Sequence, residues 1–280
     1  MAPKFSQRLD RILAARDSLV CVGLDPDPAL MPKSLRRLPP RTQLSRFLDG
    51  IVQATFPHAA AYKMQFGSYL QYGAEGVEVL SQLCRRIGAT RVRILDLKAN
   101  DIPNTLRMVR DGAFREFGFD AITLTPWFGW ETLQPFLDDP AHGVFVVAHS
   151  SNPGSLDFQE IPTPRGPLWL AVVGEVRRLA HANGNVGVVL GATFSDAFHA
   201  ARATLGNGIP ILVPGVGAQG GSLATAVREG VDAHGRALLV NASRSVLYAS
   251  SERDWKKAAG AEAERLKVQI NQLRAGLRTG

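Results

Sequence analysis

Eight short apolar runs recur along this chain, and stretches with a helical spacing of apolar residues separate most of them. The runs cover residues 19–25, 60–65, 92–98, 121–126, 144–150, 186–193, 211–215 and 238–243. The helical stretches cover residues 43–55, 69–87, 105–117, 169–182, 195–205 and 222–229. Apolar strands that alternate with amphipathic helices predict a parallel α/β sheet, and eight such units predict a closed (β/α)8 TIM barrel. An open, doubly wound sheet is the alternative.

The length and composition fit one domain of this kind. The chain has 280 residues, 45% of them hydrophobic, which suits a single barrel over residues 1–280. No apolar run approaches the roughly 18 residues that a membrane helix needs, so we expect no membrane association. Cys21 and Cys84 lie in apolar contexts without metal-ligand spacing, which predicts buried, reduced thiols in a cytoplasmic protein.

Three segments lie outside the regular alternation of strands and helices. Residues 1–18 place Phe5, Leu9, Ile12 and Leu13 on one helical face, which predicts a helix that covers one end of the core. Residues 152–167 are rich in proline and predict a long irregular insert of the kind that often serves as a lid or binding loop. Residues 251–277 predict a basic C-terminal helix.

The net charge of +7 would permit nucleic-acid binding. The positive charge is scattered over several helices, however, and is not concentrated in one stripe or patch. Solvated helix faces and a site for an anionic metabolite explain the excess equally well. We therefore expect no nucleic-acid partner.

The run at residues 92–98 ends in charged side chains, within the motif Asp96-x-Lys98-x-x-Asp101. Alternate side chains of a strand share a face, so Asp96 and Lys98 are predicted to point the same way as Ile94. Burying a carboxylate beside an ammonium is costly unless the two are paired or used in chemistry. The segment indicates the rim of an active site, with a plain ion pair at a strand end as the alternative.

The other predicted strands also end in polar, proline or glycine residues. These are Asp25, Lys63, Gln65, Thr125, Ser150, Ser151, Asn152, Thr193, Pro214, Gly215, Ser243 and Arg244. In a barrel, the ligand site lies at the C-terminal ends of the strands, so these side chains should converge there. The glycine-rich loop at residues 214–221, with Arg244 beyond the last strand, predicts a phosphate site.

Several of these motifs, in this order, resemble one enzyme family. They are Asp96-x-Lys98-x-x-Asp101-Ile102-Pro103-Asn104-Thr105, the segment 61–65 around Lys63, the loop 214–221, and Asn241-Ala242-Ser243-Arg244-Ser245. Together they resemble orotidine 5′-phosphate decarboxylase, and residues 21–28 are similar to its longer bacterial branch. The resemblance implies conversion of orotidine 5′-monophosphate to UMP and carbon dioxide, the last step of de novo pyrimidine synthesis. It also implies that no metal or organic cofactor takes part.

The resemblance assigns catalysis to an array of four charged residues. It implies that Lys98 is the general acid that protonates C6, while Asp96 faces the substrate carboxylate. Lys63 and Asp101 would complete the array and keep Lys98 charged and oriented. In the family, the acid that matches Asp101 enters from the partner subunit, and the threonine that matches Thr105 serves the partner's ribose site. The resemblance therefore implies a homodimer with active sites at the interface.

Contacts to each part of the nucleotide also follow from the resemblance. Asp25 and Lys63 match ribose ligands, and Ser151 matches the serine that contacts the pyrimidine, with Ser150 as the alternative. Ile102 would supply apolar wall near the leaving carboxylate. The residues matched to the phosphate site and its loop are Pro214, Gln219, Gly220 and Arg244.

Two rival classes of protein fit part of the pattern. A Mg²⁺-dependent sugar-phosphate decarboxylase or aldolase of the same barrel group shares the D-x-K-x-x-D motif. A second ammonium, Lys63 beside Lys98, disfavours a metal ion at these acids. The more distant rival is a basic nucleic-acid-binding protein, whose signature would be salt-dependent binding to any duplex.

Two further features are assigned supporting roles. His149 ends the fifth predicted strand and is expected to support the site from behind rather than to catalyse. The segment Trp127-Phe128-Gly129-Trp130 is expected to pack around the barrel mouth rather than to stack on a nucleobase.

Overall fold

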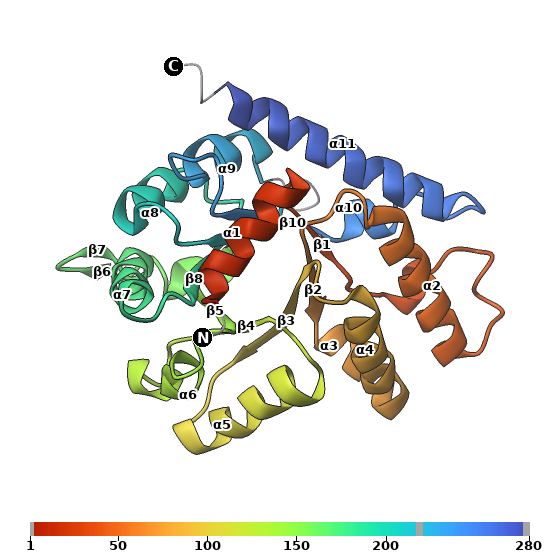
Figure 1. The fold of residues 1–280 in the computed structure, drawn as a ribbon, viewed down its shortest axis with the longest axis horizontal. Helices are drawn as coiled ribbons and strands as arrows, with labels where there is room; N and C mark the ends of the chain where they lie inside the picture. Colours follow the sequence, from red (N-terminus) through yellow and green to blue (C-terminus); the bar gives the residue numbers. More distant parts are fainter. Residues whose placement is uncertain (1–2, 217–220, 277–280) are drawn as a thin grey trace.

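The computed structural model describes residues 3–216 and 221–276, and its main feature is a closed parallel barrel (Figure 1). The barrel strands are β1 (Val20–Gly23), β2 (Ala61–Gln65), β3 (Val92–Ala99), β4 (Ala121–Leu124), β5 (Gly143–His149), β8 (Val186–Leu190), β9 (Ile211–Val213) and β10 (Leu238–Ala242). Their order around the barrel is β1-β10-β9-β8-β5-β4-β3-β2, so β1 and β10 close the ring. The predicted (β/α)8 barrel is confirmed, and the open sheet is wrong.

Helices surround the barrel on its outer face (Figure 1). The α-helices after the first strand are α2 (Pro40–Thr55), α3 (Gly67–Leu70), α4 (Gly73–Ile87), α5 (Pro103–Asp111), α6 (Gln134–Leu137), α7 (Leu168–Asn183), α8 (Ala197–Leu205), α9 (Leu223–Gly230), α10 (Arg244–Leu247) and α11 (Trp255–Ala275). Short 3-10 or π turns are η1 (Pro28–Leu30), η2 (Gly112–Glu116), η3 (Trp130–Leu133) and η4 (Pro153–Asp157). Since helices cover one face of each strand and the barrel interior the other, the strands are largely apolar.

One predicted helix, residues 69–87, is interrupted in the structure. Helix α3 ends at Leu70, and α4 begins at Gly73, whose φ of +62° lies in the left-handed region that breaks a helix. The turn lets α4 pack closely on α3, because a Cβ at Gly76 would overlap the carbonyl oxygen of Tyr69. Helical spacing continued through this turn, so the sequence pattern did not reveal it.

Helix α1 (Phe5–Arg16) lies across one end of the barrel, as predicted (Figure 1). The ring of Phe5 packs edge-on against Phe145 of β5, with the ring centroids 6.0 Å apart. Arg8 donates to Asp120, just before β4, at 2.5 Å. These contacts place α1 over the N-terminal ends of the strands and leave the opposite end open.

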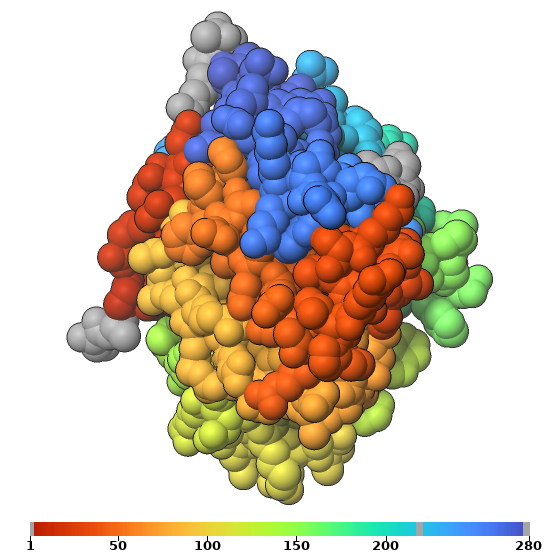
Figure 2. Space-filling model, turned by 90° about the vertical axis from the view of Figure 1, so that its right-hand side faces the viewer, coloured from red at the N-terminus to blue at the C-terminus, as the bar shows by residue number. Residues whose placement is uncertain are grey.

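The insert at residues 152–167 and the C-terminal segment both contain regular secondary structure. Residues 152–167 contain η4 and a short antiparallel pair, β6 (Pro162–Thr163) with β7 (Gly166–Pro167), so the prediction of an irregular insert was partly wrong. The predicted C-terminal helix is α11, which lies against α2 (Figure 2). Among the described residues, no helix combines the length and hydropathy needed to cross a membrane.

Candidate active site

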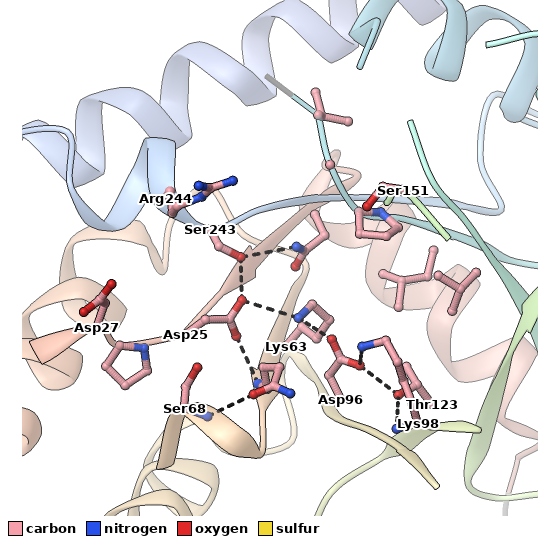
Figure 3. A pocket seen from close by; sticks show the side chains of 18 of the residues that line it. Asp25, Asp27, Lys63, Ser68, Asp96, Lys98, Thr123, Ser151, Ser243 and Arg244 are labelled. Carbon is pink, nitrogen blue, oxygen red and sulfur yellow. Dashed lines mark hydrogen bonds and ion pairs between the residues drawn. The ribbon is translucent and has the colours of Figure 1, made fainter. Parts of the chain in front are cut away.

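A cavity of about 570 Å³ opens at the C-terminal ends of the barrel strands (Figure 3). Its wall includes Asp25, Lys63, Gln65, Asp96, Lys98, Thr123, Ser151, Pro214, Asn241, Ser243, Arg244 and Tyr248. These residues come from the ends of seven strands or the loops that follow them: β1, β2, β3, β4, β5, β9 and β10. The polar strand ends noted in the sequence therefore largely converge on one site.

Lys63 lies between two carboxylates at the base of this cavity. Its Nζ is 2.7 Å from Asp96 Oδ2 and 3.5 Å from Asp25 Oδ2. The lysine side chain is only 5% exposed, so its charge depends on these neighbours. Lys98 Nζ approaches the other oxygen of Asp96, Oδ1, at 2.5 Å. Acids and ammoniums thus alternate in one row, in the order Asp25, Lys63, Asp96 and Lys98.

The row holds Asp96 and Lys63, its two buried members, in the charged state at neutral pH. Burial works against ionisation of Asp96, but the charges of Lys63 and Lys98 and their hydrogen bonds outweigh it and hold its pKa well below the usual range. Burial also works against a charge on Lys63. The carboxylates of Asp25 and Asp96 outweigh that effect and raise the pKa of Lys63.

Lys98 differs from Lys63 in exposure and in backbone conformation. Its side chain is 45% exposed and borders the open cavity, whereas Asp96 beneath it is 9% exposed. Its φ is +53°, in the left-handed region that residues other than glycine rarely adopt. The backbone N–H of Lys98 donates to Thr123 Oγ1 at 3.0 Å, and that hydroxyl donates to Asp96 Oδ1 at 2.9 Å.

Asp25 is held by groups from both neighbouring strands. Its Oδ1 accepts from the backbone N–H of Gln65 at 3.0 Å, and its Oδ2 accepts from the hydroxyl of Ser243 at 2.7 Å. Asn241 Nδ2 donates in turn to Ser243 Oγ at 3.4 Å. The carboxylate that begins the charged row is therefore fixed across the seam where β1 meets β10.

The predicted pyrimidine and phosphate contacts border the same cavity where the structure describes them. Ser151, Pro214 and Arg244 are in its wall. Ser150 instead binds Gln159 and Asn152 of the insert through its backbone and hydroxyl groups. Of the two candidate serines, Ser151 is the one that borders the cavity. Gln219 and Gly220, the other predicted phosphate ligands, lie outside the described residues.

Asp101, Ile102 and Thr105 lie outside the wall of this cavity. Asp101 is in the loop after β3, where its Oδ1 accepts from the backbone N–H of Ile102 at 2.7 Å. Thr105 is in the first turn of α5, and the Ile102 side chain is 56% exposed. Within one chain the structure brings together Asp96, Lys98 and Lys63, but it does not bring Asp101 to them.

His149 is not in the wall of the cavity, and it contacts the insert and Phe194. Its ring is fully buried, with Nε2 2.9 Å from Glu160 Oε1 and Nδ1 3.0 Å from the carbonyl oxygen of Ser150. The ring of Phe194 packs against it, at a centroid distance of 3.8 Å. His149 therefore connects the end of β5 to the insert through Glu160.

The aromatic segment after β4 is only partly packed. Trp130 is half-buried, whereas Trp127 is 68% exposed and Phe128 is 50% exposed. Trp127 packs edge-on against Phe158 of the insert, with the centroids 5.7 Å apart. Both belong to the rim of a second cavity, of about 510 Å³, which lies between the β4 loop and the insert. The predicted packing role holds for Trp130 and is incomplete for Trp127.

Several residues of the cavity wall were not predicted from the sequence, among them Thr123 and Tyr248. Thr123 stands within an apolar run, where threonine is common for its β-propensity alone. Tyr248 follows α10, and its hydroxyl accepts from the backbone N–H of Asp27 at 2.6 Å. A polar residue facing the barrel interior was the available signal for Thr123, and no sequence signal pointed to Tyr248. Over residues 3–216 and 221–276, no three or more His, Cys, Asp or Glu side chains are grouped as a metal site.

The chain is similar to known proteins over most of its length. A family model described as Orotidine 5'-phosphate decarboxylase / HUMPS family matches residues 18–259. The chain is 38% identical over 274 residues to orotidine 5'-phosphate decarboxylase of Bordetella pertussis, covering 96% of this chain and 99% of the relative. It is 38% identical over 272 residues to the enzyme of the same name from Thermomicrobium roseum, covering 96% of each.

A solved structure gives the same result for the fold. The structure of Leishmania donovani OMP decarboxylase superimposes with a TM-score of 0.84 at 33% sequence identity. The match covers 98% of this chain and 99% of that one.

Proposed function

This chain belongs to the orotidine 5'-phosphate decarboxylase / HUMPS family, and from that premise we propose how its residues convert orotidine 5′-monophosphate to UMP and carbon dioxide. The reaction is the last step of the de novo synthesis of UMP. We take the whole chain, residues 1–280, to act as one domain, and its free, buried cysteines support a location in the cytoplasm.

The row formed by Asp25, Lys63, Asp96 and Lys98 is the observation that carries this proposal. Decarboxylation at C6 leaves an electron pair on a carbon that no ring carbonyl can directly delocalise. A fixed ammonium close to that carbon stabilises the developing negative charge electrostatically. Lys98 is suited to this task because its ammonium is held by Asp96 while its side chain borders the open cavity.

Lys98 also supplies the proton in the proposed mechanism. The bond between C6 and the carboxylate carbon breaks, carbon dioxide leaves, and the electron pair stays on C6. The ammonium of Lys98 then donates a proton to C6, which gives UMP and a neutral amine that regains its proton from solvent. Lys63 cannot easily take this role, because it is buried between two carboxylates.

Asp96 acts on the substrate carboxylate in this proposal. Its low pKa keeps it ionised at neutral pH, so it meets the negative substrate carboxylate with a like charge. The repulsion disappears when neutral carbon dioxide forms, which favours the transition state relative to the bound substrate. Lys63 and Lys98 keep Asp96 ionised in spite of its burial.

The ribose, the pyrimidine ring and the phosphate bind to other residues of the cavity wall in this proposal. We place the ribose hydroxyls against Asp25 and Lys63, and the pyrimidine against Ser151. Arg244 borders the cavity beyond β10 and offers a planar guanidinium for the phosphate. Gln219 and Gly220 stay predictions for the same phosphate, with Pro214 at the base of their loop.

We further propose a homodimer in which Asp101 and Thr105 serve the partner's active site. Apolar side chains are exposed beside these residues: Ile102 at 56%, Met108 at 66% and Trp127 at 68%. They belong to the connections that follow the neighbouring strands β3 and β4. Exposed apolar surface of this kind is typical of an interface, and Ile102 would reach the partner's substrate from it.

The proposal is tested by a spectrophotometric assay with orotidine 5′-monophosphate in the presence of EDTA. We expect full turnover with chelator, because the proposed mechanism uses only side chains. Folded protein without turnover would disprove the proposed activity. Activity that is lost on chelation and restored by Mg²⁺ would instead favour the metal-dependent rival of the same barrel group.

A further inference from the structure

The pairing of β3 with β4 contains an irregularity at the active site. Leu95 pairs with Ile122, and Ala99 pairs with Leu124, so three residues of β3 lie opposite one residue of β4. The three are Asp96, Leu97 and Lys98, and the one is Thr123. A bulge of this kind redirects side chains and leaves ladder groups without their usual partners.

The bulge gives Lys98 an unusual backbone. Its φ of +53° is left-handed, a conformation in which the Cβ of any residue other than glycine is crowded. Such a conformation persists only where the surroundings hold it, and conformations of this kind cluster at functional sites. Lys98 therefore needs a specific contact that favours this backbone over an ordinary extended strand.

The Thr123 hydroxyl supplies that contact. It accepts a hydrogen bond from the backbone N–H of Lys98 at 3.0 Å, in place of a carbonyl of the strand ladder (Figure 3). Its own hydrogen goes to Asp96 Oδ1 at 2.9 Å. Because an ionised carboxylate only accepts and an amide N–H only donates, the hydroxyl has one possible orientation.

Thr123 is 1% exposed, so solvent is a poor substitute for its hydroxyl. Asp96 Oδ1 also binds Lys98 Nζ at 2.5 Å. One hydroxyl therefore links the backbone of Lys98 to the carboxylate that holds the ammonium of the same residue. Thr123 therefore helps to orient both the backbone of Lys98, directly, and its ammonium, through Asp96.

We propose that Thr123 is a positioning residue, which holds the left-handed backbone at Lys98 and the orientation of Asp96 and thereby directs the ammonium of Lys98 at the reacting carbon. This inference deepens the proposed function and rests on it. Thr123 does not touch the reacting atoms in this role, so its removal should affect the chemical step more than substrate binding.

The test is the pair of variants Thr123→Val and Thr123→Ser. Valine keeps the shape and removes the hydroxyl, and we expect kcat for orotidine 5′-monophosphate to fall about 100-fold while KM changes little. Serine keeps the hydroxyl, and it should restore kcat to within a few-fold of the unmodified protein. Equal kcat values for Thr123→Val and the unmodified protein, or equal losses in both variants, would overturn the inference.

Thr55→Val is the matched control for loss of a buried threonine hydroxyl. Thr55 is fully buried and is not in the cavity wall; it donates to the carbonyl oxygen of Ile51 at 2.8 Å, and its hydroxyl also lies 3.0 Å from that of Tyr62. This variant should be less stable and yet keep the kcat of the unmodified protein. If it loses kcat as strongly as Thr123→Val does, the effect of Thr123 is general destabilisation and the inference is wrong.

Hydrogen exchange of the Lys98 amide tests the contact without a variant. We expect slow exchange in the unmodified protein, because the Thr123 hydroxyl holds this N–H although the lysine side chain is 45% exposed. Exchange as fast as in a free peptide would overturn the inference even if Thr123→Val failed to fold. Unmodified protein without decarboxylase activity would disprove the proposed function instead, and amide exchange would then decide the role of Thr123 alone.

Discussion

Lys63 and Lys98 are both bound to Asp96, but their surroundings give them different tasks. Lys63 is 5% exposed and lies between Asp96 and Asp25, so it is a fixed charge that keeps the two acids together. Lys98 is 45% exposed, and within the described residues its ion pair is with Asp96. The difference in exposure supports the proposal that Lys98, rather than Lys63, reaches a substrate atom and exchanges protons with solvent.

Replacement of Lys98 by alanine should remove the chemical step and leave binding largely intact. We expect kcat to fall by about 10⁴-fold or more, because both the stabilising ammonium and the proton donor are lost. Binding of UMP, measured by calorimetry, should stay within about 10-fold of the unmodified protein. Lys33→Ala is the control, since Lys33 forms an exposed ion pair with Glu252 and lies outside the cavity wall. A loss of less than about 10-fold in kcat for Lys98→Ala would exclude it as the proton donor.

The charged row should also make stability depend on pH at both extremes. The folded-state pKa of Asp96 is lowered, so its stabilisation is present above the unfolded value of about 3.9 and is lost as pH falls through the folded value. The pKa of Lys63 is raised, so its stabilisation is present below about 10.4 and is lost as pH rises through the folded value. Between these two pH values, Asp96 and Lys63 both contribute fully to the stability of the folded state.

The contribution of Asp96 to stability at low pH is measured by urea unfolding of Asp96→Asn and of the unmodified protein across this pH range. At neutral pH the variant should be less stable by about 3 kcal/mol, because Lys63 keeps only its longer contact with Asp25. The difference should be constant from about pH 5 to 9 and should shrink below about pH 4. Asp49→Asn, which breaks an exposed pair with Arg86, should change stability by less than about 1 kcal/mol at any pH. A difference for Asp96→Asn that persists unchanged to pH 2 would contradict this account.

At the scale of the elements, the seam between β1 and β10 brings the ends of the barrel together at the site. Gly23 of β1 faces Ser243, and a Cβ at Gly23 would overlap the Ser243 hydroxyl. That hydroxyl is the donor that holds Asp25 at 2.7 Å. The absence of a side chain at Gly23 therefore allows the contact that orients the predicted ribose-binding acid.

Gly23→Ala should weaken substrate binding through this seam. The added methyl displaces Ser243, frees Asp25 and raises KM by about 10-fold or more, whereas the barrel itself should still form. Gly174→Ala is the control, because nothing lies within 4 Å of a Cβ there and the residue is in α7. That variant should keep KM and gain up to about 1 kcal/mol in stability. An unchanged KM for Gly23→Ala would show that Ser243 can shift without weakening substrate binding, and would contradict this prediction.

The sequence predicted the barrel because its strands are buried on both faces and read as apolar runs. It did not predict the turn at Gly73, because helical spacing continues through it, or the β6–β7 pair, whose strands have two residues each. Among the site residues, charge at strand ends identified Asp25, Lys63, Asp96 and Lys98. The β3 bulge was not predictable, because it depends on how β4 pairs with β3 rather than on either strand alone.

At the scale of the whole molecule, the motif that begins at Asp96 is divided between two places. Asp96 and Lys98 are in the cavity of their own chain, whereas Asp101 and Thr105 are outside its wall. The proposed dimer gives the second pair a role in the partner's cavity. Each proposed site then draws on two copies of the same short segment.

Dimers that combine two inactive variants test whether Asp101 serves the active site of the partner subunit. Lys98→Ala and Asp101→Ala dimers, unfolded together and reassembled, should regain about a quarter of the unmodified activity, because half of the dimers are mixed and each has one intact site. Lys98→Ala mixed with Asp96→Ala should regain none, since both residues serve their own chain's cavity. Recovery in the second mixture, or none in the first, would contradict the shared site.

The contact between Ser243 and Asp25 joins residues that are 218 positions apart in the chain. Because β10 is the last barrel strand and it pairs with the first, this contact cannot form on the ribosome until nearly the whole chain has emerged. Earlier strands can bring Lys63 and Asp96 together while Asp25 still lacks its serine. Catalytic competence should therefore appear late in synthesis and late in refolding, after most helical structure has formed.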